Sequence, residues 1–488
     1  MGDSVTKTLH PFQQQASRGI NRLLNSSRDP VLCMPTGTGK TFTACDIIKH
    51  RITMKERIFI LTPQIEIFNQ WLLELTLMKI DSGYINDKGV IGKNKQVYVC
   101  MPMSLNNLLP VLPEKFKPDL IITDECHHSS AATWTNIYTF FPDARKLGLT
   151  ATPKRMDGQG LDSIYTDIIE PINMQEAIEQ GFLSEPALII PKQYIDEIPI
   201  NNGEYDTQTQ ADQLGKPQII GDIITQYGNI FAGLPVLCAC STHEHAKHMT
   251  DQFCNAGWNF KHIHSGLNYH ERQSMLQGIV KGEINGLCTV GIGIEGLDIP
   301  GLHGLIWLRR TMSITIYLQF IGRVLRKAKG KKYGIIIDPV GNTFIHGRPE
   351  LKRIWTLQGE GSGKPSDDLA PKMKICPLCN VMNAENNLYC HICNFDFSQI
   401  DNIEGLKNKR GFPAMVEGEL VFLDADKMTD RLKDIQSAMQ KNNKMSDRSD
   451  NSGSKKIKKL SQAEKMQLLK DGLSKKNNFF EKMREKYI

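Results

Sequence analysis

A short glycine-rich segment, residues 35–41, constrains the fold of this chain more than any other feature. It follows an apolar run at 31–34 and precedes a stretch of helical periodicity. Between a strand and a helix, the backbone N–H groups of such a loop point inward with the helix dipole behind them, which creates a phosphate site. We expect Lys40 to reach the β- and γ-phosphates of a nucleotide and Thr41 to bind Mg²⁺; a glycine-rich turn without function is the alternative. The predicted nucleotide-binding residues of this loop are Pro35, Thr36, Gly37, Thr38, Gly39, Lys40 and Thr41.

Apolar runs alternate with helical patterns over two long stretches of the 488 residues. This alternation predicts an α/β fold in which each stretch forms a parallel sheet covered by helices. The first stretch, 1–155, has candidate strands at 31–34, 58–61, 97–101, 120–123 and 147–149. The second, 233–345, has them at 236–239, 260–264, 286–290, 305–308 and 334–337. We interpret 156–232, with a polar loop at 201–213, as a connector between two lobes.

The composition changes after residue 345. We expect a linker at 346–373, a cysteine module at 374–400, a hairpin and helix at 401–441, and a tail at 442–488 that ends in an amphipathic helix. Residues 441–488 hold 14 Lys or Arg against 6 Asp or Glu, a charge of +8 within a total of +6, so the remainder carries −2. The tail is either a solvated, disordered end or a contact for a polyanion. Its helix is expected to dock on the motor or on a protein partner, not on a membrane.

Two further groups of residues complete the chemistry that the loop at 35–41 begins. Asp124 and Glu125 follow an apolar strand, so one carboxylate can hold Mg²⁺ and the other can orient and deprotonate an attacking water. We assign Asp124 to the metal and Glu125 to the water. Gln319, Arg323 and Arg326 recur at helical spacing in 319–326, where two arginines can stabilise the charge of a phosphoryl transition state. A solvated basic helix face is the alternative for this segment.

Four of the 12 cysteines form the pattern CxxC, ten residues, CxxC. Two such pairs supply the tetrahedral thiolate shell of a structural Zn²⁺ site, which has no open position for catalysis. Disulfides are the lesser alternative in a reducing compartment. The predicted zinc ligands are Cys376, Cys379, Cys390 and Cys393; the other eight cysteines stand singly in apolar stretches and are predicted to be buried thiols.

Four segments of the chain resemble motifs of superfamily 2 helicases of the DEAD/H type: TGTGKT at 36–41, DECH at 124–127, LTATP at 149–153 and QFIGRVLR at 319–326. The resemblance covers about 8–345 and implies two tandem RecA-like P-loop domains that use ATP and Mg²⁺. It also implies that Gln13 contacts adenine and that Gly296 and Asp298 belong to the nucleotide-linked motif V. The residues implied to lie near a nucleic-acid strand are Thr62, Pro63, Ala151, Thr152, Ser265 and Thr289.

Within the superfamily, the chain is most similar to RadD-like DNA repair helicases and to phage-encoded branch-migration helicases, through DECH, residues 155–158, 180–183 and 338–342, and the cysteine cluster. The predicted function is therefore an ATP-dependent translocase or helicase that remodels branched or forked DNA in repair, recombination or replication. The alternatives are an RNA helicase and an ATP-switched nucleic-acid-binding subunit of a nuclease complex.

The expected location follows from two absences in the sequence. No run approaches the ~20 apolar residues that a transmembrane helix needs, and residues 1–10 lack the pattern of a secretory signal. We expect a soluble protein of the bacterial or phage-infected cytoplasm, associated with the nucleoid and not with a membrane.

Overall fold

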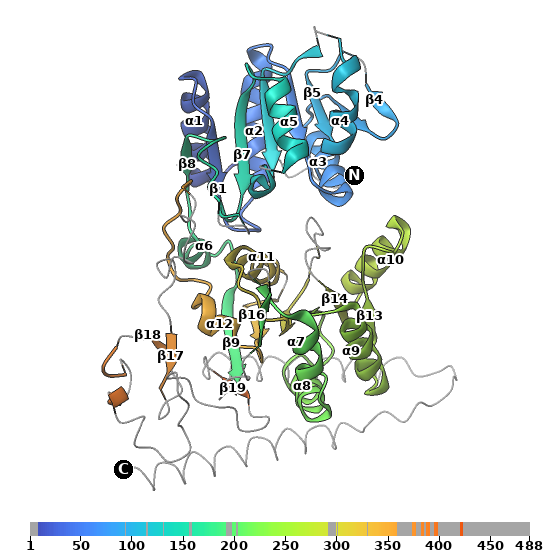
Figure 1. Ribbon diagram of the computed structural model, residues 1–488, viewed down its shortest axis with the longest axis vertical. Helices are drawn as coiled ribbons and strands as arrows, with labels where there is room; N and C mark the ends of the chain where they lie inside the picture. Colours follow the sequence, from blue (N-terminus) through green and yellow to red (C-terminus); the bar gives the residue numbers. More distant parts are fainter. Residues whose placement is uncertain are drawn as a thin grey trace.

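The chain folds into two α/β lobes joined in tandem (Figure 1). The computed structural model describes residues 8–92, 94–113, 116–129, 131–155, 159–191, 198–201, 204–290, 299, 301–328, 330–358, 373–376, 382–384, 387–390, 395–398 and 420–422. Lobe 1 is blue to teal in Figure 1 and lobe 2 is green to orange, with α6 (Met174–Glu179) and α11 (Ile314–Val324) at their junction. Among the described residues, none of the helices combines the length and the apolar character needed to cross a bilayer.

Lobe 1 is built on an eight-stranded sheet in the order β4-β3-β5-β2-β6-β7-β1-β8. All of its strand pairs are parallel except β3 with β4. Its strands are β1 (Pro30–Cys33), β2 (Ile58–Leu61), β3 (Ser82–Asn86), β4 (Gly89–Ile91), β5 (Val97–Cys100), β6 (Leu120–Asp124), β7 (Arg145–Thr150) and β8 (Asp167–Ile169). Its helices are α1 (Pro11–Asn25), α2 (Lys40–Thr53), α3 (Ile65–Leu77), α4 (Pro102–Leu108) and α5 (Ala132–Phe140).

Lobe 2 contains a seven-stranded sheet in the order β13-β14-β12-β15-β16-β9-β19, in which only β19 is antiparallel. Its strands are β9 (Glu185–Pro191), β12 (Val236–Cys240), β13 (Phe260–His262), β14 (Gly286–Val290), β15 (Gly304–Leu308), β16 (Tyr333–Ile337) and β19 (Leu420–Phe422). Its helices are α7 (Thr207–Leu214), α8 (Pro217–Ile230), α9 (His243–Asn255), α10 (Tyr269–Val280), α11 and α12 (Asn342–His346). Two small hairpins pair β10 (Ile200–Asn201) with β11 (Glu204–Tyr205) and β17 (Met373–Ile375) with β18 (Met382–Ala384).

The ten strands predicted from the sequence are all confirmed, with ends that differ by no more than two residues. They were recognisable because helices cover both faces of a parallel sheet, so its central strands are continuous apolar runs. The four residues of β2, for example, are all fully buried. The predicted fold class of two tandem RecA-like lobes therefore matches the structure.

The segment 156–232, predicted as a connector or insertion between the lobes, also contributes a strand to each sheet. The three residues of β8 pair with β1 at the edge of lobe 1, and β9 pairs with β16 in lobe 2. The polar loop predicted at 201–213 contains α7, whose first turn is capped by the Asp206 side chain accepting from Thr209 N at 2.8 Å. The short edge strand β8 and the capped polar helix α7 carry little apolar periodicity, which is why the pattern missed them.

The first part of the predicted linker 346–373 is also packed structure. Residues 347–358 return from α12 to lobe 1, seen as the orange segment that rises beside β8 in Figure 1, where Leu357 O accepts from Leu161 N at 2.6 Å. Arg353 is 5% exposed and donates to four backbone carbonyls, those of His346, Arg348, Pro349 and Leu351. A buried arginine that saturates carbonyl groups holds this irregular segment in place. The hairpin and helix expected at 401–441 lie outside the described residues, except for β19, and the tail at 442–488 lies wholly outside them.

Candidate active site

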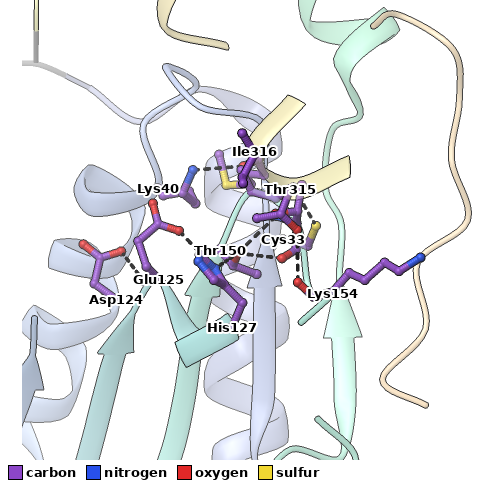
Figure 2. Close-up of polar contacts among 12 residues, drawn as sticks. Cys33, Lys40, Asp124, Glu125, His127, Thr150, Lys154, Thr315 and Ile316 are labelled. Carbon is purple, nitrogen blue, oxygen red and sulfur yellow. Dashed lines mark hydrogen bonds and ion pairs between the residues drawn. The ribbon is translucent and has the colours of Figure 1, made fainter. Parts of the chain in front are cut away.

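The glycine-rich loop has the backbone conformation that phosphate binding requires. Gly37 and Gly39 have φ values of 90° and 89°, in the left-handed region that favours glycine. Gly39 is the N-cap of α2, and a Cβ atom there would lie 2.5 Å from Nε2 of Gln13. Lys40 Nζ donates to Met34 O at 3.0 Å, so its side chain lies folded over the loop (Figure 2). Burial lowers the pKa of Lys40, and the neighbouring Glu125 and Asp124 oppose that shift.

Gln13 is a link between α1 and this loop. Its side chain is 3% exposed, and its Nε2 donates to Thr38 O at 3.0 Å while its Oε1 accepts from His10 N at 2.9 Å. The amide therefore ties the start of α1 to the phosphate loop. This position, against the loop, is consistent with the predicted place of Gln13 beside a nucleotide.

Asp124 is held at the carboxyl end of β6 by two hydrogen bonds. Trp71 Nε1 donates to its Oδ2 at 2.7 Å, and the backbone N–H of Glu125 donates to its Oδ1 at 3.0 Å. Burial, and after it the charge of Glu125, raise the pKa of Asp124 to about 6, although the Trp71 bond acts in the opposite direction. The carboxylates of Asp124 and Glu125 therefore lie close together in a partly buried site, an arrangement that a bound divalent cation would stabilise. Trp71 was not among the predicted site residues.

A chain of polar contacts leads from Glu125 to the turn after β7 (Figure 2). His127 Nδ1 lies 3.5 Å from Glu125 Oε2 and 3.3 Å from Thr150 Oγ1. The Thr150 hydroxyl donates to Thr152 O at 3.0 Å and accepts from Thr152 N at 3.1 Å. Because the single hydroxyl proton of Thr150 is directed at Thr152, Nδ1 of His127 is the atom that carries the proton in this contact. The chain joins the carboxylate pair to the LTATP segment.

Helix α11 of lobe 2 packs directly on the phosphate loop of lobe 1. A Cβ atom on Gly322 would lie 2.8 Å from Thr36 Cβ, and one on Gly37 would lie 2.9 Å from Arg326 Cγ. Thr315 Oγ1, at the start of α11, donates to Lys154 O at 3.0 Å (Figure 2). The glycines at these two positions therefore allow the close approach of the lobes.

The prediction that residues 319–326 form one helix is correct for Gln319 and Arg323, which lie in α11, and wrong for Arg326, which lies beyond its end. The helix ends at Val324, and the Arg326 backbone instead pairs with Leu183 in an isolated antiparallel bridge. Gln319 is 6% exposed, and its Nε2 has no hydrogen-bond partner among the described residues. A buried amide donor next to the phosphate loop fits an acceptor oxygen of a ligand, since an unmade buried hydrogen bond is costly.

Lys331 is a buried lysine that sequence reasoning missed. Its Nζ donates to Val324 O, Leu302 O and Arg326 O, and its side chain lies behind the C-terminus of α11. Its amino group supplies hydrogen bonds to carbonyls at the C-terminus of the helix, where the last carbonyls have no partner within the helix. Lys331 thereby holds the backbone of Arg326 in place. In the sequence it stands in the basic run 327–332, which is typical of a solvated surface.

The residues predicted to contact nucleic acid differ in exposure. Thr62, Thr152 and Thr289 are buried, Pro63 and Ala151 are partly buried, and only Ser265 of the six is exposed. A second contact between the lobes lies near this set, where Arg272 Nη2 meets Glu66 Oε1 at 2.6 Å. Arg272 Nη1 also donates to Leu267 O at 3.0 Å. Gly296 and Asp298 lie outside the described residues.

The cysteine predictions are tested only in part. Cys376 and Cys390, one from each CxxC pair, are buried in one small cluster with Phe397, and Cys379 and Cys393 lie outside the described residues. Of the eight single cysteines, seven are buried as predicted. The exception is Cys254 near the end of α9, which is exposed.

Comparisons with known proteins match both lobes. The family model of the type III restriction enzyme res subunit matches residues 6–155, and that of the helicase conserved C-terminal domain matches 215–328. A 51.5 kDa protein of a Lactococcus phage is 30% identical over 401 residues, 81% of this chain and 82% of that protein. A putative mitochondrial ATP-dependent helicase, irc3 of Schizosaccharomyces pombe, is 27% identical over 68% of this chain and 57% of its own length.

The solved structure of the DEAD-box helicase Mss116, bound to single-stranded RNA and UDP-BeF, superimposes with a TM-score of 0.50 at 16% identity, over 67% of this chain and 69% of that one. At this identity the likeness concerns the fold alone. The res-subunit model matches lobe 1, the helicase C-terminal model matches lobe 2, and the phosphate loop of lobe 1 lies against α11 of lobe 2. The chain belongs to the superfamily 2 helicases and is an ATP-hydrolysing enzyme.

Proposed function

We propose that this helicase is a DNA translocase that remodels branched or forked DNA, and that ATP controls the approach of its two lobes. The observation that carries the proposal is the contact of α11 with the phosphate loop, where Gly322 meets Thr36 and Arg326 meets Gly37. A nucleotide held by this loop would touch both lobes. Its binding and hydrolysis therefore bias a two-lobe equilibrium, which is the requirement for a motor.

The roles of the site residues in this proposal follow their positions. Lys40 and the loop amides bind the phosphates, and Thr41 and Asp124 hold Mg²⁺, which supplies charge neutralisation on the phosphate oxygens when bound. Glu125 orients the attacking water and takes its proton. Arg323 and Arg326 stabilise the charge that develops on the γ-phosphoryl group, and the Gln319 amide donates to one of its oxygens.

The polar chain from Glu125 to Thr152 supports a route by which hydrolysis reaches the strand-binding side. His127 Nδ1 contacts Thr150 Oγ1 and lies 3.5 Å from Glu125 Oε2, so we expect a change in the charge near Glu125 to alter the hydrogen bonds of the LTATP turn. The next residues reach α11 through the Thr315 contact with Lys154 O. We propose that Thr62, Pro63, Ala151, Thr152, Ser265 and Thr289 line the strand path, with the buried threonines acting mainly through backbone groups.

DNA is favoured over RNA by the res-subunit model on lobe 1, since that family is named for restriction enzymes. An RNA helicase, the alternative that the sequence leaves open, is the second candidate. We expect the ATPase rate of the full-length chain to rise more with forked or four-way DNA than with single-stranded DNA, linear duplex or RNA of equal length. Steady-state ATPase rates across these five nucleic acids would measure this. Stimulation by RNA alone would overturn the DNA assignment, and equal stimulation by linear and forked duplex would overturn the branch preference.

We propose that Cys376, Cys379, Cys390 and Cys393 bind one structural Zn²⁺. The support is that Cys376 and Cys390, from separate CxxC pairs, are 0% and 1% exposed in one cluster, where Asn383 Nδ2 donates to Cys390 Sγ at 3.5 Å. Buried thiols at such spacing fit a closed tetrahedral site. We expect about one equivalent of zinc per chain by elemental analysis after purification without chelator, and its loss in a Cys376→Ser/Cys379→Ser variant. Less than half an equivalent in the unaltered chain would contradict this site.

We expect the ATPase rate at acidic pH to depend on the protonation of Asp124. Its pKa is raised to about 6, so the group is ionised and able to bind Mg²⁺ above that pH and becomes protonated below it. We expect the rate to fall as the pH drops through about 6, and excess Mg²⁺ to move the midpoint lower because the cation binds the ionised form. Trp71→Phe removes a hydrogen bond that lowers this pKa, so its midpoint should move higher. Profiles at two Mg²⁺ concentrations measure both shifts, and a midpoint indifferent to Mg²⁺ would exclude Asp124 as its origin.

A further inference from the structure

Three histidine side chains meet at one edge of the lobe 2 sheet, away from the nucleotide site. His243 begins α9 directly after β12, His262 ends β13, and His264 follows two residues later. β12 and β13 lie on either side of β14 and run parallel to it, so their carboxyl ends share one edge. The three imidazoles therefore come from separate turns of the backbone and are brought together only by the sheet. The proposed ATPase mechanism uses none of them.

The distances within this cluster approach those of a metal site with three histidine ligands. His243 Nδ1 and His262 Nε2 are 3.4 Å apart. The ring centroids are 4.7 Å apart for His262 and His264, 5.5 Å for His243 and His262, and 6.0 Å for His243 and His264. A Zn–N bond of about 2.0–2.1 Å places each ring centroid roughly 3.2 Å from the ion, so two ligands at tetrahedral angles have centroids ~5 Å apart. The three observed separations bracket that value.

The longest of the three centroid distances, 6.0 Å, joins His264 to His243, and the His243 side chain is the one that can move most easily. His243 is exposed, while His262 and His264 are partly buried. Rotation about the side-chain bonds of His243 is thus not opposed by packing, and it would bring this ring toward the other two. The nitrogen atoms of the three rings do not all lie within 4.8 Å of one another, so the rings must reorient for the site to close on an ion.

We propose that His243, His262 and His264 bind one divalent transition-metal ion of the class that prefers imidazole, such as Zn²⁺ or Co²⁺. The ion fastens the first residue of α9 to the end of β13. Three protein ligands leave a fourth coordination position for water or a phosphate oxygen, as in open zinc sites. The exposed Ser265 follows His264 directly, so this position lies next to a residue that we place on the strand path.

A second cluster offers the main competitor for such an ion. The sulfur atoms of Cys238, Cys240 and Cys288 lie within 4.8 Å of one another, and all three residues are buried. They belong to an apolar cluster that includes Phe253 and Phe260. Three thiolates around a divalent ion would place a net negative charge there, which is unfavourable in an apolar interior. We therefore assign the ion to the histidines and use Cys288 as the control.

Cobalt titration of the full-length chain, with one equivalent of zinc bound to the site of Cys376, Cys379, Cys390 and Cys393, tests the proposal. We expect one equivalent of Co²⁺ to bind with visible absorption bands but without a thiolate-to-cobalt charge-transfer band. His262→Ala and His264→Ala should each weaken binding by at least about tenfold, since even outer-shell changes cost that much. His270→Ala, an exposed histidine on α10, and Cys288→Ser should bind as the unaltered chain does.

The melting temperature, measured with and without Zn²⁺, shows whether a variant that binds no metal is still folded. Zn²⁺ should raise the melting temperature of the unaltered chain and of His270→Ala, because a ligand that binds only the native state stabilises it. His243→Ala, altered at an exposed position, should fold normally and lose this shift. The proposal is overturned if no second equivalent binds, if the charge-transfer band is present, or if Cys288→Ser abolishes binding.

Discussion

Replacing Glu125 by glutamine is expected to lower the rate of ATP hydrolysis by roughly 10²–10⁴-fold, the usual contribution of a positioned general base. Glutamine keeps the size of the side chain but cannot accept the proton of the attacking water. The left-handed backbone of Glu125, with φ of 51°, and the hydrogen bond from its N–H to Asp124 stay available, so the site should keep its shape. Steady-state kcat in the presence of DNA would measure the loss.

ATP binding should survive in this variant, because the phosphate loop and Asp124 are unchanged. Binding of a fluorescent ATP analogue provides that control. Glu179→Gln, at an exposed glutamate at the end of α6, is the matched substitution and should leave kcat unaltered. If Glu125→Gln retained more than about a tenth of the activity, another group would have to be the base and the role of Glu125 would be wrong.

Replacing Arg326 by alanine is expected to cost roughly 10³–10⁵-fold in kcat, the range observed for arginine fingers. Its side chain lies over Gly37 of the phosphate loop, and it reaches that loop from the other lobe. The backbone bridge between Arg326 and Leu183 and the Lys331 bond to Arg326 O do not involve the side chain. The variant should therefore fold, and ATP affinity should change much less than kcat.

Lys327→Ala is the control for Arg326→Ala, since it removes a neighbouring positive charge at an exposed position. Melting temperature and ATP affinity would show whether the fold and the loop are intact. A loss in ATP affinity as large as the loss in kcat would indicate that Arg326 acts in ground-state binding, because a group that serves the transition state alone lowers kcat. Equal rates for Arg326→Ala and Lys327→Ala would remove Arg326 from the mechanism.

Local patterns sufficed for the elements that lie at the centre of each sheet. β2 and β14 were predicted with their observed ends, because a strand covered on both faces is apolar at most of its positions. The phosphate loop and the carboxylate pair were predictable for a related reason. Their chemistry requires particular residues at fixed spacing beside a strand end, and that spacing is visible without the fold.

Other parts of the site depend on residues that are distant in the chain. Trp71 on α3 meets Asp124 only after β2 and β6 pair in the sheet, and His127 meets Thr150 only after β6 and β7 pair. Lys331 appears in the sequence as one lysine in a basic run, and its three carbonyl partners become visible only when α11 ends above it. Hydrophobic periodicity gives no signal for such contacts, because it reflects only the element in which each residue lies.

The sequence by itself determined the family, the two lobes and the residues of the phosphate chemistry, because strand periodicity and the motif spacings are local properties of the chain. Only the tertiary structure decided that segment 156–232 is shared between both sheets, that residues 347–358 return to lobe 1, and that Arg326 reaches the phosphate loop from beyond the end of α11. The same holds for the cluster of His243, His262 and His264. These arrangements arise from the pairing of strands and the packing of the lobes, in which the burial of apolar surface selects partners that sequence distance does not reveal.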